Sequence, residues 1–550
     1  MKPAESYDAM CAQQRWRIPD HFNMGVAVCD KQKQRDVALI HPLPDNEVRE
    51  YTFGDLKRLS NRLANLLVAK GINRGDRVGI LLPQTPETAT AHVAIYKAGM
   101  VAMPLFVLFG ADALEYRLAD SGARALITDR ENAAKLVGIR DRLPNLEVVL
   151  SIDGPGEDGA GGALDFHGEL AKVSDKFDPV DTLAEEPGLL IYTSGTTGPP
   201  KGALHAHRVL IGHMPGVEMI FDFFPQPGDV AWTPADWAWI GGLYDVLMPA
   251  LYRGVPQVIN PPGKFDAEAA FELIARFGIN VAFIPPTGLK MMRQIANPRD
   301  RWNYSLRTVF SGGEALGNEL MGWGRDALGV IINEAYGQTE CNVIVGCCGG
   351  IMTPPPGSMG RASPGHDLKI LDENGVEVPR GELGSICCKA PDPVMFLEYW
   401  NQPEATRNKF VTDANGDEWL VTGDTAKQDA DGWIFFIGRD DDVITSSGYR
   451  IGPAEVEDCL FAHPAVALSA VIGVPDPERT ERVKAFIILN EGFEGSDELA
   501  REIQTHVRTR LAAHEYPREV EFVTELPMTT TGKIQRKVLR EMEVAKQAAE

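Results

Sequence analysis

The sequence predicts an α/β protein with a large N-terminal domain of layered sheets and helices and a small C-terminal α+β domain. At 550 residues the chain exceeds the size at which a single hydrophobic core keeps growing. Between residues 51 and 129, helix-like and strand-like segments alternate, which is typical of a mostly parallel sheet covered by helices. A cluster of glycine and charged residues at 438–444 then separates a shorter stretch with its own α/β pattern.

The positions of helices and strands in the large domain are predicted from the period of the hydrophobic residues and from turn residues. Turn sequences such as Arg74-Gly75-Asp76 separate them, and apolar runs such as 78–82 suit strands that are buried on both faces. The pattern predicts helices at 53–69 and 89–98, and strands at 77–82 and 126–128.

The C-terminal domain is predicted to begin beyond a hinge. A strand-like segment at 433–437 runs into the cluster at 438–444, and we place the boundary so that the domains cover residues 1–440 and 441–550. Leu499, Ile503, Val507 and Leu511 keep one face of a helix apolar. The other elements predicted here are a helix at 453–461 and strands at 467–474 and 483–489.

Composition and charge exclude several classes of protein. With 44% hydrophobic and 24% charged residues the chain is globular, and its net charge of -23 disfavours binding to nucleic acid or to an anionic membrane. We find no secretory signal and no apolar stretch long enough to span a bilayer. The eight cysteines lack zinc-site spacings, so buried, reduced thiols are expected. These features predict a cytoplasmic protein.

The segment Tyr192–Gly202 carries the strongest chemical signal in the chain, and it follows the apolar run 188–191. Its glycines let backbone N–H groups turn toward an anion, its hydroxyls add short donors, and Lys201 adds a positive charge. These features predict a loop that binds a polyphosphate. The residues assigned to it are Thr193, Ser194, Gly195, Thr196, Thr197, Gly198 and Lys201.

This loop lacks the Gly-Lys-Ser/Thr ending of a Walker A motif, which disfavours an ordinary P-loop NTPase. It resembles the phosphate loop of the adenylate-forming superfamily, which comprises acyl-CoA synthetases, adenylation domains of peptide synthetases, and luciferases. Because other segments match in the expected order, the resemblance covers nearly the whole chain, and the chain is similar to acetyl- and medium-chain acyl-CoA synthetases. It implies an adenylate-forming domain followed by a small mobile domain. The matching segments are 311–315, 334–340, 422–424, 438–441 and 527–534.

The resemblance implies a nucleotide site in which each residue type suits its role. Asp424 would accept hydrogen bonds from the ribose hydroxyls, Tyr336 would stack on adenine, and Glu334 would accept from the adenine amino group. Thr339 would donate to the α-phosphate, and Glu340 would be the Mg²⁺ ligand, since carboxylates and phosphates commonly share that ion. The other adenine and ribose residues are Gly313, Glu314, Ala315 and Arg439.

Lys533 is the lysine that the resemblance makes catalytic, together with Thr339 and Glu340. A positioned ammonium stabilises the charge that builds during displacement at the α-phosphate. Because Lys533 lies beyond the hinge, where Asp441 is expected to rotate, it can enter for one half-reaction and leave for the next. Its acetylation would remove the charge, so a lysine acetyltransferase or deacylase is a further candidate partner.

The reaction implied is the ATP-dependent activation of a small-molecule carboxylate to an acyl-adenylate, followed by transfer of the acyl group to coenzyme A. ATP, Mg²⁺ and coenzyme A are thus the expected cofactors and co-substrates. Gly448 and Arg450 would bind coenzyme A in the rotated state. Three alternatives stay open: an enzyme that loads a carrier-protein thiol, although no carrier domain is expected here; a catalytically silent nucleotide-binding regulator; and a luciferase-like oxygenase.

The acyl pocket is expected to be deep. Acetate-using members of the superfamily have tryptophan at the position of Gly337, and small residues at the neighbouring positions leave further space. Since each buried methylene contributes about 0.8 kcal/mol, we predict a medium-chain, branched or aromatic carboxylate. A Gly337→Trp variant should then prefer short acids. The pocket residues predicted are Trp239, Ile240, Gly241, Gly312 and Gly337.

His205 and His207 resemble a metal-binding pair, but no third ligand lies near them in the sequence. We therefore expect surface or hydrogen-bonded histidines in place of a metal site.

Overall fold

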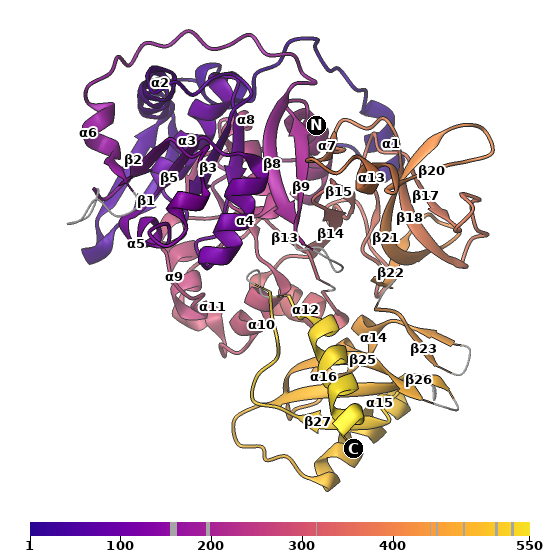
Figure 1. The fold of residues 1–550 in the computed structure, drawn as a ribbon. Helices are drawn as coiled ribbons and strands as arrows, with labels where there is room; N and C mark the ends of the chain where they lie inside the picture. The colour runs from indigo at the N-terminus through magenta and orange to yellow at the C-terminus, as the bar shows by residue number, and fades with distance from the viewer. Residues whose placement is uncertain are drawn as a thin grey trace.

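A computed structural model describes residues 1–154, 162–193, 199–314, 316–439, 442–446, 449–476, 479–511, 515–529 and 533–549. It confirms the predicted α/β fold, with a large N-terminal domain of layered sheets and a small C-terminal domain (Figure 1). The boundary predicted between residues 440 and 441 lies outside these ranges and stays a prediction.

Two mixed sheets form the core of the large domain, and each has parallel central strands with antiparallel pairs toward an edge. Over the described ranges, the first has the order β16 (Arg361–Ala362), β15 (Cys341–Gly346), β14 (Ile332–Gln338), β13 (Thr308–Gly312), β12 (Val281–Phe283), β10 (Ala231–Trp232), β11 (Gln257–Val258), β1 (Val37–Pro42) and β2 (Val48–Thr52). The second has the order β19 (Glu398–Tyr399), β9 (Lys201–Ala206), β8 (Pro187–Thr193), β4 (Val101–Pro104), β3 (Arg77–Leu81), β5 (Ala125–Thr128), β6 (Val148–Ser151) and β7 (Leu164–Asp165).

Helices cover these sheets, and their ends follow from capping residues. The predicted helix at 53–69 is α2, where Thr52 and Asp55 form a capping box. The helix predicted at 89–98 begins earlier, at Pro86, because Thr85 caps it and proline suits its first turn. The α-helices of this domain are α1 (Tyr7–Gln13), α2 (Phe53–Ala69), α3 (Pro86–Lys97), α4 (Ala111–Ser121), α5 (Arg130–Ala134), α6 (Phe166–Leu170), α7 (Val209–Ile220), α8 (Met248–Arg253), α9 (Ala267–Phe277), α10 (Pro286–Arg293), α11 (Pro298–Arg301), α12 (Asn318–Trp323) and α13 (Pro403–Arg407).

Shorter helical turns complete the large domain. Three are π-helices, η1 (Val26–Asp30), η5 (Gly241–Leu247) and η6 (Gly324–Leu328), and two are 3₁₀ turns, η2 (Pro44–Asn46) and η3 (Arg140–Arg142), among the residues described. Single π-turns often occur at functional sites, and η5 begins at a glycine predicted to line the acyl pocket.

A smaller antiparallel sheet leads to the C-terminal domain. It consists of β17 (Leu368–Leu371), β18 (Leu383–Lys389), β21 (Glu418–Gln428), β20 (Phe410–Thr412) and β22 (Ile434–Arg439). The C-terminal domain has its own sheet and buried core, with β24 (Tyr449–Ile451), β23 (Ile444–Ser446), β26 (Thr480–Leu489), β25 (Val466–Asp476), β27 (Glu519–Phe522), α14 (Pro453–Phe461), α15 (Asp497–Arg510) and α16 (Arg536–Ala549). Figure 1 shows it in yellow beside α10 and α12 of the large domain.

The structure overturns the surface alternative for His205 and His207 and bears out the hydrogen-bonded alternative for His207. His205 and His207 are fully buried, and the Met24 backbone N–H donates to His207 Nδ1 at 3.2 Å. Burial lowers the pKa of His205 to about 3, so its ring is neutral. No group of three His, Cys, Asp or Glu side chains within the described ranges could hold a metal ion.

The cysteines are free thiols, and seven of the eight are buried. Within the part of the chain that the structure describes, no helix combines the length and the hydropathy needed to cross a membrane.

Candidate active site

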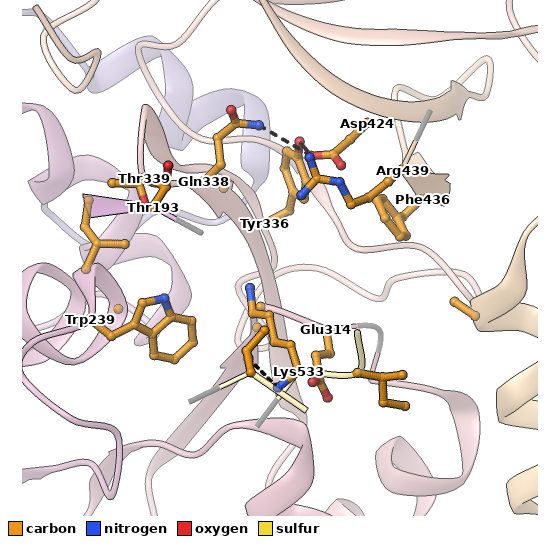
Figure 2. A pocket seen from close by; sticks show the side chains of 18 of the residues that line it. Thr193, Trp239, Glu314, Tyr336, Gln338, Thr339, Asp424, Phe436, Arg439 and Lys533 are labelled. Atoms are coloured by element: carbon orange, nitrogen blue, oxygen red, sulfur yellow. Dashed lines mark hydrogen bonds between the residues drawn. The ribbon is translucent and has the colours of Figure 1, made fainter. Parts of the chain in front are cut away.

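A cavity of about 900 Å³ lies where the C-terminal domain meets the large domain, and residues of both line it (Figure 2). The structure therefore brings together segments that are far apart in the sequence. The predicted site residues that line it are Thr193, Lys201, Trp239, Ile240, Gly241, Gly312, Gly313, Glu314, Glu334, Tyr336, Gly337, Thr339, Glu340, Asp424, Arg439 and Lys533.

A β-hairpin positions the first cation. Strands β8 and β9 pair in antiparallel register with Thr193 opposite Lys201, and the Thr193 hydroxyl donates to the Lys201 carbonyl at 3.3 Å. The Lys201 ammonium lies 5.1 Å from the ring centre of Tyr399, whose hydroxyl donates to the buried Glu340 carboxylate. The hairpin thus directs Lys201 toward Glu340. The intervening Ser194, Gly195, Thr196, Thr197 and Gly198 lie outside the described residues.

A second antiparallel pair of strands determines where the Asp424 carboxylate lies. Strands β21 and β22 place Asp424 opposite Arg439. Asp424 Oδ2 accepts a hydrogen bond from the Tyr336 hydroxyl at 2.6 Å and one from Gln338 Nε2 at 3.4 Å (Figure 2). Because β14 supplies both donors, the adjacent sheets hold Asp424 in one orientation before any ligand binds.

Burial raises the pKa of two glutamates in the cavity. It raises the pKa of Glu334 to about 7, although the Leu316 backbone N–H donates to Glu334 at 3.3 Å. It also raises the pKa of Glu314, against the opposing charges of Lys290 and Lys533. A protonated glutamate can donate a hydrogen bond as well as accept one, and it does not repel a polyphosphate as a carboxylate would.

Lys533 of the C-terminal domain lines the cavity, and hydrogen bonds to Thr529 hold its backbone. The Thr529 backbone N–H donates to the Lys533 carbonyl at 2.7 Å, and the Lys533 N–H donates to the Thr529 hydroxyl at 3.0 Å. The Lys533 ammonium lies 5.5 Å from the ring centre of Trp239, and Figure 2 shows it between Trp239 and Glu314. Burial lowers its pKa, while Glu314 and Asp424 oppose that shift.

The sequence did not point to Lys409, which lines the same cavity. Its ammonium donates to Gln338 Oε1 at 3.0 Å and to the carbonyls of Val421 and Thr422 at 3.0 and 2.9 Å. Burial lowers its pKa, and Glu340 and Asp424 counteract this. A lone lysine between asparagine and phenylalanine carries no motif, so only the fold reveals this cation.

Three aromatic rings form one wall. Phe283 and Phe310 stack with ring centres 4.2 Å apart, and Trp239 lies 5.7 Å from Phe283. All three side chains line the cavity. The sequence indicated only Trp239, since Phe283 and Phe310 lie in ordinary buried strands.

The pocket glycines require a correction to the Gly337→Trp prediction. A Cβ on Gly337 would lie 2.3 Å from the Val343 backbone nitrogen, and one on Gly312 would lie 2.5 Å from the Ala335 carbonyl oxygen. Of the three glycines predicted for the acyl pocket, Gly241 is the one whose nearest atom is a ring carbon, of Phe283 at 3.1 Å. A tryptophan at residue 337 would therefore displace backbone, so that variant does not test pocket depth.

Several predicted residues are not placed. Ala315, Asp441 and Gly448 lie outside the described residues, and the Arg450 side chain does too, although its backbone belongs to β24. The hinge and the coenzyme A contacts accordingly stay predictions.

The fold and the cavity define an adenylate-forming enzyme with a lysine supplied by its C-terminal domain. Comparisons with known proteins agree. The AMP-binding enzyme family matches residues 27–400, and the AMP-binding enzyme C-terminal domain matches residues 455–533. The chain belongs to this family, in its acyl-CoA synthetase branch.

Individual relatives cover almost the whole chain. Acetyl-coenzyme A synthetase of Bacillus subtilis (strain 168) is 37% identical over 90% of this chain and 85% of its own. Acyl-coenzyme A synthetase ACSM3, mitochondrial, of Mus musculus is 35% identical over 98% of this chain and 93% of its own. The crystal structure of the anthranilate CoA ligase AuaEII in complex with anthranoyl-AMP has a TM-score of 0.87 and 32% identity, covering 96% of this chain and 99% of that chain.

The protein is therefore an AMP-forming acid–CoA ligase that binds ATP. The relatives' names include acetyl, acyl and anthranilate ligases, so the acid is a separate question. Because one of the relatives is named as a mitochondrial enzyme, the cytoplasmic location of this protein stays a prediction.

Proposed function

We propose that this ligase activates a medium-chain, branched or aromatic carboxylate. The observation that carries the proposal is the wall of Trp239, Phe283 and Phe310, which offers apolar area and ring faces to an acyl group. The similarity to an anthranilate CoA ligase supports an aromatic acid, and the similarity to an acetyl-coenzyme A synthetase favours the competing short acid.

The first half-reaction would join the carboxylate to the α-phosphate and release pyrophosphate. In this proposal Lys201 serves the β- and γ-phosphates that leave, Lys533 stabilises charge at the reacting centre, and Thr339 donates to the α-phosphate. Asp424, held by Tyr336 and Gln338, binds the ribose hydroxyls. The remaining nucleotide contacts proposed are Thr193, Gly313, Glu314, Glu334 and Arg439, all of which line the cavity.

Glu340 is the proposed Mg²⁺ ligand. No cluster of three potential ligands occurs within the described ranges, so side chains alone form no closed metal site there. This fits an ion that binds one or two carboxylates together with substrate phosphates. The Tyr399 hydroxyl, which donates to Glu340 Oε1, would orient the carboxylate.

The second half-reaction would transfer the acyl group to coenzyme A after rotation at Asp441, with Gly448 and Arg450 near the thiol substrate. Acetylation of Lys533 by a partner enzyme belongs to the same proposal, since it would remove the charge that only adenylation needs.

Steady-state kinetics over straight-chain acids of two to ten carbons, branched acids and substituted benzoates tests the substrate class. Pyrophosphate and thioester should both be formed, and kcat/KM should rise from acetate toward longer or ring-bearing acids. A clear preference for acetate would overturn the proposed class without touching the ligase activity.

A further inference from the structure

A buried polar triad borders the same cavity and has no role in the reaction described above. Asn342 Nδ2 donates to Asp245 Oδ1 at 2.8 Å and lies 3.3 Å from His213 Nε2. Asp245 and Asn342 line the cavity, although only 4% and 7% of their respective surfaces are exposed. In a purely hydrophobic acyl pocket, two apolar side chains would cost less folding free energy, because buried polar groups are unfavourable unless they form hydrogen bonds.

The triad lies beside the glycines of the predicted acyl pocket. Asp245 follows Gly241 by about one turn of η5, and a Cβ on Gly337 would approach the Cα atom of Asn342 to 2.7 Å. The next residue, Val343, has φ of 51°, a conformation that a β-branched residue rarely adopts. The backbone is thus strained where it presents Asn342 to the cavity.

Hydrogen-bond accounting fixes which groups the triad can still offer. His213 Nδ1 lies 2.8 Å from the Val209 carbonyl, which can only accept, so Nδ1 carries the hydrogen and Nε2 is an acceptor. Burial lowers the pKa of His213 to about 4, which keeps the ring neutral. Asn342 Nδ2 then donates one hydrogen to His213 and the other to Asp245. What remains for a molecule in the cavity is the Asn342 carbonyl and the second carboxyl oxygen of Asp245.

Burial favours the neutral carboxyl form of Asp245 in this setting. Burial raises its pKa well above the ordinary value, and the hydrogen bond from Asn342 only partly opposes that. With Oδ1 accepting from Asn342, the other oxygen can carry the proton and donate it. A neighbouring Asn342 carbonyl accepts. One uncharged group that both donates and accepts hydrogen bonds satisfies this pair, and a hydroxyl is the simplest such group.

We propose that Asp245 and Asn342, oriented by His213, select carboxylic acids that carry a hydroxyl group on the ring or chain remote from the carboxylate. This inference rests on the proposed function and names its substrate class more closely. An acid without the hydroxyl would leave both polar groups without a partner, and such sites discriminate strongly.

Matched pairs of acids test the proposal: benzoate with 3- and 4-hydroxybenzoate, 3-phenylpropanoate with its 4-hydroxy derivative, and hexanoate with 6-hydroxyhexanoate. The ratio of kcat/KM within a pair should favour the hydroxy acid by at least about tenfold in at least one pair. Asp245→Leu should bring that ratio to about one, mainly by slowing the hydroxy acid. Asp245→Asn keeps one acceptor and one donor at nearly unchanged volume, so it should largely retain the ratio.

Tyr244→Phe is the matched control, because Tyr244 belongs to the same η5 but its hydroxyl contacts Met24 and Tyr96 in the core. It should leave the ratio unchanged. A wild-type ratio near one in every pair, or equal losses for both acids in Asp245→Leu, would refute the triad's role in selection.

A binding experiment distinguishes a failure of this inference from a failure of the proposed function. If no acid gives AMP and thioester, the proposed function fails. Calorimetric titration of the same pairs in the presence of AMP then still decides the triad's role. Tighter binding of the hydroxy acid, lost in Asp245→Leu, supports it, and equal affinities contradict it.

Discussion

At the residue scale, burial has a larger effect than pairing on the pKa values of four charged groups of the cavity, Lys533, Lys409, Glu314 and Glu334. It is the largest contribution to the lowered pKa values of Lys533 and Lys409 and to the raised pKa values of Glu314 and Glu334. Each shift favours the neutral form. Lys533 is therefore a lysine whose ammonium loses its proton more readily than an ordinary lysine does.

The lowered pKa of Lys533 predicts a pH dependence. Its ammonium is present below that pKa and is lost as the pH rises through it, so acyl-adenylate formation should decline at a pH below the ordinary lysine value of 10.5. The measurement is a pH profile of carboxylate-dependent pyrophosphate exchange. Thioester formation from supplied acyl-adenylate is the control, and the same alkaline decline in both half-reactions would contradict the assignment.

At the scale of helices and strands, the register between paired strands brings residues of separate sequence motifs together in one site. The β8–β9 pair sets Lys201 opposite Thr193, and the β21–β22 pair sets Asp424 opposite Arg439. The close approach of β14 to β15 explains Gly337, because a side chain there would meet the backbone of Asn342 and Val343.

Gly337→Ala should consequently destabilise the protein. The added Cβ would overlap the Val343 nitrogen, and overpacking of this kind costs about 1–3 kcal/mol, seen as a lower thermal midpoint. Gly322→Ala is the matched control, since a Cβ at that position in α12 meets nothing within 4 Å. It should be neutral or stabilising by about 0.4–1 kcal/mol. Equal midpoints for the two variants would show that β14 and β15 are not closely packed.

The positions of some helices could be predicted from the sequence, and those of others could not. Hydrophobic period and turn residues located α2 and α14 at their observed bounds. They missed the start of α3, which is buried on nearly every face and so has little amphipathic signal. Lys409, Phe283 and Phe310 belong to the cavity only because strands far apart in the chain become neighbours, and no local pattern encodes that.

At the scale of the whole molecule, the position of Lys533 depends on how the C-terminal domain docks. Phe461 of α14 lies against α10 of the large domain, with the Lys290 ammonium 5.3 Å and the Arg293 guanidinium carbon 5.0 Å from its ring centre. Cation–π contacts of this kind contribute roughly 0.5–1 kcal/mol each when exposed. They favour the orientation in which Lys533 is in the cavity.

Phe461→Ala should therefore slow adenylation by about three- to tenfold and leave thioester formation from acyl-adenylate nearly unchanged. Single-turnover rates of the two half-reactions provide the measurement. Phe493→Ala, at a 44% exposed phenylalanine of the same domain, is the control and should change neither rate. A matching loss in both half-reactions would contradict a role in docking.

We propose that Lys533, a lysine of the C-terminal domain, serves adenylation alone. Lys533→Ala tests it most directly, with both half-reactions followed separately in the purified full-length protein. We expect carboxylate-dependent pyrophosphate exchange to fall by at least about 100-fold, while thioester formation from supplied acyl-adenylate and coenzyme A stays within about threefold of the wild type. Equal loss of both half-reactions, or retained pyrophosphate exchange, would contradict the account.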